Sequence, residues 1–243
     1  SNFGTQKIDR LMESQKKALD SFPHLETDDQ TIGASRLFFW GHGQISECMH
    51  VMPDGSVLLL VGSPCGEINW LDVQERLLSG SFILPWEGRV ILLRVSADGK
   101  HWTIWNDWLG SIPVFHTAIG QDRIASTLEP VVVSAAEYTS EDFFIPGLVS
   151  LLLNGHFISD WTLYKGMKVV PPDSMTEWED RTFRTKRLWT VQPSQSRWET
   201  GWDDLIDEMH ELSSRAVSNA LKTQPAWLLP LSSGLDSRLI AGV

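Results

Sequence analysis

Two Asp-Gly pairs constrain the fold of this chain more than any other feature. Asp54-Gly55 lies between the apolar runs CMHVM and SVLLLV, and Asp98-Gly99 lies between RVILLRVS and KHWTIWN. Both residue types tolerate the positive φ angles of a tight turn, so each pair predicts a β-hairpin. A third pair of strand-like runs, IPVFHTA and RIAST, follows with a glycine between them. Residues from about 37 to 129 are therefore expected to form a mostly antiparallel β region.

Helical patterns flank this β region. Apolar spacing predicts a peripheral helix over residues 6–21 and a second helix over residues 140–155. The stretch KGMKVVPPDS is expected to form a strand that leads into a Pro-Pro turn. The polar residues 191–201 are the predicted linker, and residues 202–222 again carry apolar side chains at helical spacing.

Composition argues against several partners and locations. A formal net charge of −11 makes nucleic acid or an anionic membrane surface a poor partner. No apolar run approaches the roughly 20 residues that span a bilayer, and the start SNFGTQKIDR lacks the apolar core of a secretory signal. The cysteines, Cys48 and Cys65, are too few for a disulfide framework. We expect reduced thiols in a cytoplasmic protein.

The most specific candidate site is the segment AWLLPLSSGLDSRLIAGV at residues 226–243. WLLPL predicts a short buried parallel strand, and a helix is expected from Asp236 onward. Between them, Ser232, Ser233 and Gly234 can leave backbone N–H groups pointing into a concavity. The N-terminus of the helix would direct the positive end of its dipole at the same place. This pattern predicts a phosphate-binding loop.

Asp236 and Ser237 indicate which ligand this loop could bind. Ser237 adds a hydroxyl donor to those of Ser232 and Ser233. A carboxylate beside phosphate is repulsive unless a divalent cation lies between them, and Mg²⁺ is typically held by carboxylate and phosphate oxygens. Asp236 is therefore the candidate Mg²⁺ ligand. The motif G-x-x-x-x-G-K-[ST] is absent, which excludes P-loop kinases and GTPases. The alternative is a Ser/Gly turn with Asp236 as an ordinary helix N-cap.

Several motifs resemble those of the asparagine synthetase superfamily, in the same order along the chain. SSGLDS resembles the SGGxDS pyrophosphate loop, with Ser233 in place of its first glycine. NGHFISDWTLYKGMKVVPPDSMT resembles the family stretch T-L-F-K-G-I-x-x-L-P-P-G, and KRLWT resembles the R-x-W that follows it. NDWLGSIPVFHTAIGQDRIAST resembles R-D-x-x-G-x-x-P-L-Y-Y followed by A-S-E. The resemblance covers roughly residues 40–243.

The resemblance implies a chain in two parts. Residues 1–190 would form a glutamine amidotransferase-like domain of the N-terminal-nucleophile amidohydrolase type, an α+β fold built as a four-layer αββα sandwich. Residues 191–201 would be the linker, and residues 202–243 the first βα unit of an α/β ATP-pyrophosphatase domain. A lone βα unit cannot bury both faces of its strand. We therefore expect this chain to be part of a longer protein.

The resemblance also implies an ATP-dependent carbon–nitrogen ligase. Family members adenylate a carboxylate with ATP and release pyrophosphate, and an amine then attacks. The pyrophosphate of ATP and Mg²⁺ would be held by Ser232, Ser233, Gly234, Asp236 and Ser237. The acyl substrate would be a small-molecule or peptide carboxylate. The nitrogen would come from ammonia or from an amine of the substrate itself, as in β-lactam synthetases and lasso-peptide cyclases. The protein could form a homodimer.

The glutaminase chemistry of the family is expected to be lost. It needs an N-terminal cysteine whose α-amine serves as the base for its own thiol, and neither Cys48 nor Cys65 can take that place without removal of a good part of the sheet. HGQIS places Gln44 where the family's H-x-R-L-S has its glutamine-binding arginine, and CGE at 65–67 replaces N-G-E, whose asparagine helps to form the oxyanion hole. The alternative function is a non-catalytic interaction domain derived from a glutaminase sandwich.

Other candidates for chemistry are weaker. His42 and His50 bracket Cys48, but their spacing matches no tetrahedral zinc site. No G-x-S-x-G elbow is present to anchor a Ser-His-Asp hydrolase. Asp107, which matches the aspartate of R-D-x-x-G, is expected to hold a turn. Asp203-Asp204 is expected to be a solvated first helical turn that suits the helix dipole.

Overall fold

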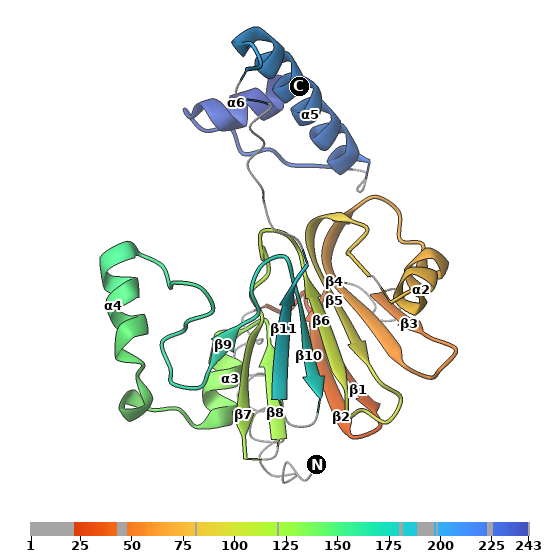
Figure 1. The fold of residues 1–243 in the computed structure, drawn as a ribbon, viewed down its shortest axis with the longest axis vertical. Helices are drawn as coiled ribbons and strands as arrows, with labels where there is room; N and C mark the ends of the chain where they lie inside the picture. The colour runs from red at the N-terminus through yellow and green to blue at the C-terminus, as the bar shows by residue number, and fades with distance from the viewer. Residues whose placement is uncertain are drawn as a thin grey trace.

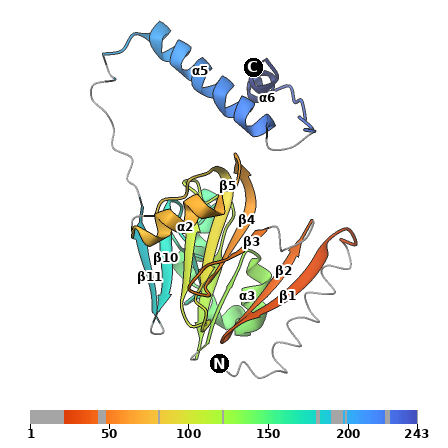
Figure 2. The ribbon, with the colours of Figure 1, turned by 90° about the vertical axis from the view of Figure 1, so that its right-hand side faces the viewer.

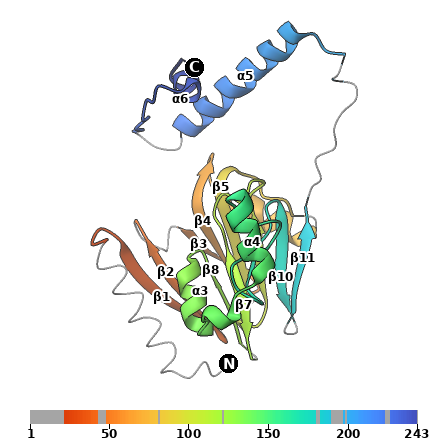
Figure 3. The same ribbon diagram turned by 90° about the vertical axis from the view of Figure 1, so that its left-hand side faces the viewer.

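The computed structural model is a β-sandwich with helices on its outer faces and two C-terminal helices apart from it (Figures 1, 2 and 3). It describes residues 22–42, 48–80, 82–120, 122–179, 182–188, 197, 199–222 and 226–242. The predicted helix over 6–21 and most of the predicted linker at 191–201 lie outside these residues. Within the described part of the chain, no helix is long and apolar enough to cross a membrane.

The central layer is a six-stranded antiparallel sheet with the order β11-β10-β6-β5-β4-β3. Its strands are β3 (Met49–Val51), β4 (Val57–Cys65), β5 (Glu87–Val95), β6 (Trp102–Asn106), β10 (Ser174–Glu179) and β11 (Thr182–Arg187). The pairings β3–β4 and β5–β6 confirm the two predicted Asp-Gly hairpins. Gly55 and Gly99 have φ angles of 78° and 69°, which residues with a side chain rarely adopt.

A three-stranded antiparallel sheet with the order β8-β7-β9 forms the next layer. Its strands are β7 (Phe115–Ile119), β8 (Asp122–Ser126) and β9 (Lys168–Val169). The β7–β8 pairing confirms the third predicted hairpin. The short strand β9, which Pro171 and Pro172 follow, confirms the strand predicted before the Pro-Pro turn.

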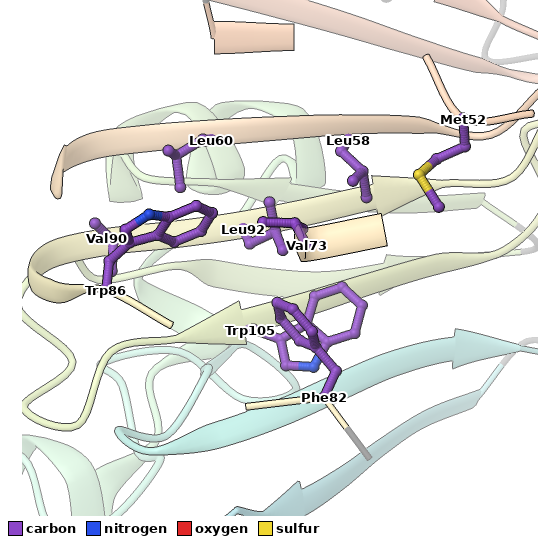
Figure 4. Close-up of a cluster of buried hydrophobic side chains, with 9 residues drawn as sticks. All are labelled: Met52, Leu58, Leu60, Val73, Phe82, Trp86, Val90, Leu92 and Trp105. Atoms are coloured by element: carbon purple, nitrogen blue, oxygen red, sulfur yellow. The ribbon is translucent and has the colours of Figure 1, made fainter. Parts of the chain in front are cut away.

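Side-chain alternation along the central strands separates two cores. On one face, the apolar side chains of β4, β5 and β6 pack against Val73 of α2 (Trp70–Leu78), as Figure 4 shows for Leu60, Leu92 and Trp105. On the other face, Ile91 packs toward the three-stranded sheet. The helix α3 (Glu129–Ala136) covers β7 and β8. The layers are therefore helix, sheet, sheet and helix, and the fold is of the mixed α+β class.

The sequence prediction missed a two-stranded hairpin, β1 (Glu26–Ile32) and β2 (Ser35–Gly41). Its tip is fixed to the β5–β6 turn, because Ala34 N–H donates to Asp98 O over 2.8 Å and Ser35 Oγ donates to Gly99 O over 2.6 Å. The approach is so close that a Cβ added to Gly33 would lie 2.1 Å from the Asp98 carbonyl carbon. The hairpin is thus anchored to the end of the central sheet that carries the β5–β6 turn, where Ile32 packs with Val57 and Val95.

The helix predicted over 140–155 is divided into η2 (Ser140–Asp142) and α4 (Ile145–Asn154). The backbone between them bonds elsewhere, since Phe143 forms a bridge with Tyr164 and Phe144 N–H donates to Leu163 O over 2.8 Å. The predicted end is confirmed, because α4 stops at a left-handed Gly155.

The C-terminal segment contains α5 (Trp202–Leu221), which confirms the predicted helix, and α6 (Leu235–Gly242). The buried parallel strand predicted at 227–231 is wrong. These residues form no strand, and Leu228 is 92% exposed. Pro230 lacks a backbone N–H to donate, and no strand lies beside this segment in the described residues. The helix α5 has no buried residue either.

A buried histidine links the two sheets. His116 of β7 is 7% exposed, and its ring lies 4.1 Å from that of Phe183 on β11. Burial, as the largest cause, lowers the pKa of His116 to about 4, although Asp160 acts in the opposite direction. Lys168 adds a smaller lowering of this pKa. The ring is therefore neutral at physiological pH.

Protonation of His116 is expected to destabilise the fold. The folded state takes up this proton only near pH 4, whereas the unfolded chain takes it up near the ordinary pKa of 6.5. The stabilisation is therefore complete above pH 6.5 and is lost as the pH falls toward 4, by on the order of 3 kcal/mol in all. Urea unfolding at a series of pH values measures this loss.

The variant His116→Leu should lose much less stability over this pH range than the wild type. His156→Gln is the matched control, because His156 is exposed and should keep the wild-type dependence. Equal loss of stability in His116→Leu and in the wild type would contradict the assignment.

Candidate functional site

The candidate site is the loop 232–234, which leads directly into α6. Ser232 N–H donates to Ser237 Oγ over 3.1 Å, and the Oγ atoms of these two serines are 3.1 Å apart. Gly234 N–H donates to Ser232 Oγ, also over 3.1 Å. Three of the residues proposed from the sequence thus converge, with two hydroxyls and two backbone N–H groups within hydrogen-bond reach of one another.

The other two predicted residues are placed differently. Ser233 contributes its carbonyl oxygen, which accepts a hydrogen bond from Arg238. Asp236 is the second residue of α6 and is exposed, and no hydrogen bond of its carboxylate is found in the described part of the chain. The alternative that Asp236 is the N-cap is therefore not supported, because it lies inside the first helical turn. A carboxylate there suits the helix dipole.

Arg238, which the sequence analysis did not select, holds the loop from its other side. Its Nη2 donates to Ser233 O over 2.7 Å, and its Nε donates to Gly234 O over 3.3 Å. In a planar trans peptide the C=O and the following N–H point in opposite directions. Because the guanidinium donates to these two carbonyls, the N–H groups of Gly234 and Leu235 point away from it. The available signal was its position four residues after Gly234, which places both on one side of a helix.

Asp107 has the turn-holding role predicted for it. It is 4% exposed, and its carboxylate accepts backbone N–H groups of Val90, Leu109 and Ser111 over 2.9–3.2 Å. These bonds tie the loop after β6 to β5. Asp107 is thus a structural residue in this fold.

The two histidines that bracket Cys48 stack on different rings. The ring of His42 stacks on that of His24, whereas the ring of His50 stacks on that of Trp70. Among the described residues no group of three or more His, Cys, Asp and Glu side chains could hold a metal ion. Asp203 and Asp204 lie exposed in the first turn of α5, as expected.

The cysteine positions require one correction. Cys65 is the last residue of β4, so a chain that began there would lack β3 and β4. Cys48, however, directly precedes β3, and the described residues before it supply only the β1–β2 hairpin. The prediction that Cys48 could not be N-terminal without loss of a good part of the sheet is therefore wrong for the two main sheets. Gln44 lies outside the described residues.

No protein-family model matches this chain, and no curated protein matches it. Solved structures that match part of this chain include the glutamine phosphoribosylpyrophosphate amidotransferase from B. subtilis complexed with ADP and GMP, at 10% identity and a TM-score of 0.33. The structure described as the allosteric regulatory enzyme of purine biosynthesis gives the same values. Each match covers 59% of this chain and 31% of the other, so this chain spans under a third of their length. Similarity at this level establishes neither a family nor an activity.

Removal of the Arg238 guanidinium is expected to loosen the loop. In Arg238→Gln, the carbonyls of Ser233 and Gly234 lose their donor, so the NMR order parameters of Gly234 and Leu235 should fall below about 0.6. Arg238→Lys should restore part of the order, and Arg215→Gln on α5 is the matched control. Unchanged order parameters in Arg238→Gln would show that the guanidinium does not orient these peptides.

Proposed function

We propose that this chain belongs to an ATP-dependent, amide-forming ligase of the asparagine synthase type. Residues 1–190 would be an amidotransferase-like sandwich of the N-terminal-nucleophile type, and residues 202–243 would begin the ATP-pyrophosphatase domain. Two findings support the proposal: the motifs occur in the family's order along the chain, and the described layers are helix, sheet, sheet and helix. The single observation that carries it is the convergence of donors in the loop 232–237.

The donors of this loop suit a pyrophosphate group. The N–H groups of Ser232 and Gly234 lie close to the hydroxyls of Ser232 and Ser237, and these groups hydrogen-bond to one another. Phosphate oxygens can replace these internal acceptors without a change of backbone path. The dipole of α6 and the cationic Arg238 both favour a negative charge there.

The carboxylate of Asp236 suits Mg²⁺ rather than phosphate. Asp236 follows Gly234 by two residues, in the first turn of α6, and a carboxylate oxygen is a preferred Mg²⁺ ligand. When bound, the ion neutralises negative charge on the leaving pyrophosphate. The role of the chain's own residues is to hold the pyrophosphate by hydrogen bonds from Ser232, Ser233, Gly234 and Ser237, and to fix its orientation relative to Asp236.

The proposed reaction has two steps. A carboxylate oxygen of a small-molecule or peptide substrate attacks the α-phosphorus of ATP, the bond to the β-phosphate breaks, and pyrophosphate leaves. The nitrogen of ammonia or of a substrate amine then attacks the acyl carbon of the acyl adenylate. The bond between the acyl carbon and the phosphate oxygen breaks, AMP leaves, and the nitrogen loses a proton. With ATP and Mg²⁺ as the only other reactants, no external glutamine is needed if the amidotransferase-like part is inactive.

One observation favours the second candidate function, a non-catalytic interaction domain. The helix α4 exposes a row of large apolar side chains, Ile145, Val149, Leu152 and Leu153, at helical spacing. Exposed apolar patches mark interaction sites more often than scattered apolar residues do. ATP cleavage by the complete protein would favour the ligase, and its absence with every amine tested would favour the interaction domain.

Loss of the Asp236 carboxylate is expected to abolish ATP cleavage in the complete protein. Without it, Mg²⁺ loses a ligand beside the leaving pyrophosphate, so Asp236→Ala should release pyrophosphate at least ~10²-fold more slowly. Asp203→Ala, in the exposed first turn of α5, is the matched control and should keep wild-type activity. Release by Asp236→Ala within a few-fold of wild type would leave the carboxylate with only a dipole role.

Glutamine is expected to give no enzyme-dependent glutamate. The loss of one oxyanion donor typically costs ~10²–10³ in rate, and the predicted losses extend to the substrate-binding arginine and, unless the chain begins at Cys48, to the nucleophile. The measurement is glutamate release by protein whose native N-terminus has been established by mass spectrometry. Cys48→Ala and Cys65→Ser should leave the background unchanged. Turnover that disappears in Cys48→Ala alone would restore a glutamine-dependent enzyme that begins at this residue.

A further inference from the structure

The strand β11 forms one edge of the six-stranded sheet. It is the last strand in the sheet order, and β10 pairs with only one of its sides. Figures 2 and 3 show it as the outermost strand at one side of the sandwich. Its six residues make it the longest edge strand of the two main sheets, since β3, β8 and β9 have three, five and two. Within the described part of the chain, no strand lies on its other side.

The pairing with β10 determines which backbone groups of β11 point outward. Leu188 N–H donates to Asp173 O over 2.8 Å, directly after the last register pair of the two strands. Hydrogen-bonded and non-hydrogen-bonded pairs alternate along an antiparallel ladder. The residues of β11 at an even distance from Leu188 therefore bond to β10, and the others direct their N–H and C=O groups away from it. These outward residues, whose backbone groups have no partner among the described residues, are Phe183, Thr185 and Arg187.

The side chains of this edge are basic, although the protein is acidic. Arg184, Lys186 and Arg187 are exposed, and β11 contains no acidic residue. None of the three cationic groups forms a hydrogen bond or an ion pair with another described residue. Even Glu177, which lies opposite Arg184 in the register with β10, makes no ion pair with it. The whole chain has 31 acidic and 20 basic residues, so this strand carries positive charge that the described fold leaves without an ion-pair partner.

The two faces of β11 differ in chemistry. Phe183 faces the three-stranded sheet, because its ring lies 4.1 Å from that of His116 on β7. Side chains alternate along a strand, so Arg184 and Lys186 both lie on the opposite, outer face, about 7 Å apart. A strand added at this edge would therefore have two cations beside it on the outer face and an aromatic ring on the inner face. Acidic side chains at alternate positions match this pattern.

We propose that the edge of β11 binds an extended acidic peptide of a partner protein, which adds an antiparallel strand to the sheet. The peptide backbone pairs with the outward groups of β11, and its Asp or Glu side chains lie beside Arg184 and Lys186. All other pairings of this sheet are antiparallel as well.

Other occupants suit this edge less well. A second copy of β11 would place cations beside cations, which is destabilising in a strand pair. A nucleic acid would offer phosphates to the cations but no regular row of donors to the outward carbonyl groups, and the net charge of −11 opposes its approach. The proposal does not depend on the ligase activity.

A capped peptide of alternating Thr and Glu residues separates strand addition from general attraction between charges. Calorimetry of the chain should show at least about tenfold tighter binding of this peptide than of the same peptide N-methylated at its Thr residues. N-methylation keeps every charge but removes the donors that would face β11. The double variant Arg184→Gln/Lys186→Gln should weaken binding about tenfold. Arg215→Gln/Lys222→Gln, which changes exposed residues at α5 by the same charge, is the matched control and should keep the wild-type affinity.

Amide hydrogen exchange in the wild type gives a second measurement that does not depend on the folding of any variant. The bound peptide should slow exchange at Phe183, Thr185 and Arg187 about tenfold or more and leave exchange in α4 unchanged. Equal affinity for the N-methylated peptide, equal binding by the two double variants, or protection that bypasses β11 would each overturn the proposal. Tighter binding of a single-stranded oligonucleotide than of the peptide would overturn it as well.

Discussion

The fold depends on the packing of β5 on both of its faces. Val90 and Leu92 point into the core under α2, while Ile91, between them in sequence, points into the core between the two sheets. Both cores therefore share one strand, whose successive residues Val90, Ile91 and Leu92 alternate between them. Asp107 adds to this constraint, since its carboxylate accepts the N–H of Val90 and so ties the loop after β6 to the same strand. The helix α2 and the three-stranded sheet pack on opposite sides of this shared strand.

Much of the sandwich could be predicted from local signals. The Asp-Gly pairs identify two hairpins from the sequence alone, because few other residue pairs adopt the positive φ angles that such turns require. The β1–β2 hairpin was missed for the opposite reason. Its tip is held by contacts with Asp98 and Gly99, which lie far along the sequence. The local sequence pattern therefore does not predict the hairpin. The gap between η2 and α4 has a similar origin, in the bridge from Phe143 to Tyr164.

In the candidate site, the motif predicts the loop and the helix but not the features that depend on contacts with other parts of the chain. The loop 232–234 and the helix after it were predicted, because the residue types of a tight turn before a helix are distinctive. The strand at 227–231 was not formed, since a parallel strand needs neighbours on its edges and the described residues provide none. The clamp by Arg238 could not be predicted from the motif, because it depends on the direction of two carbonyl groups.

We propose above all that the loop before α6 binds pyrophosphate together with Mg²⁺. The most direct test is an NMR titration of the protein with inorganic pyrophosphate, with and without Mg²⁺, in which the backbone N–H signals of the loop are followed. We expect saturable shifts of Ser232, Gly234 and Leu235 that require Mg²⁺ and that weaken in Asp236→Ala. Loop signals that do not move, or that move equally without Mg²⁺ and in the variant, would contradict it.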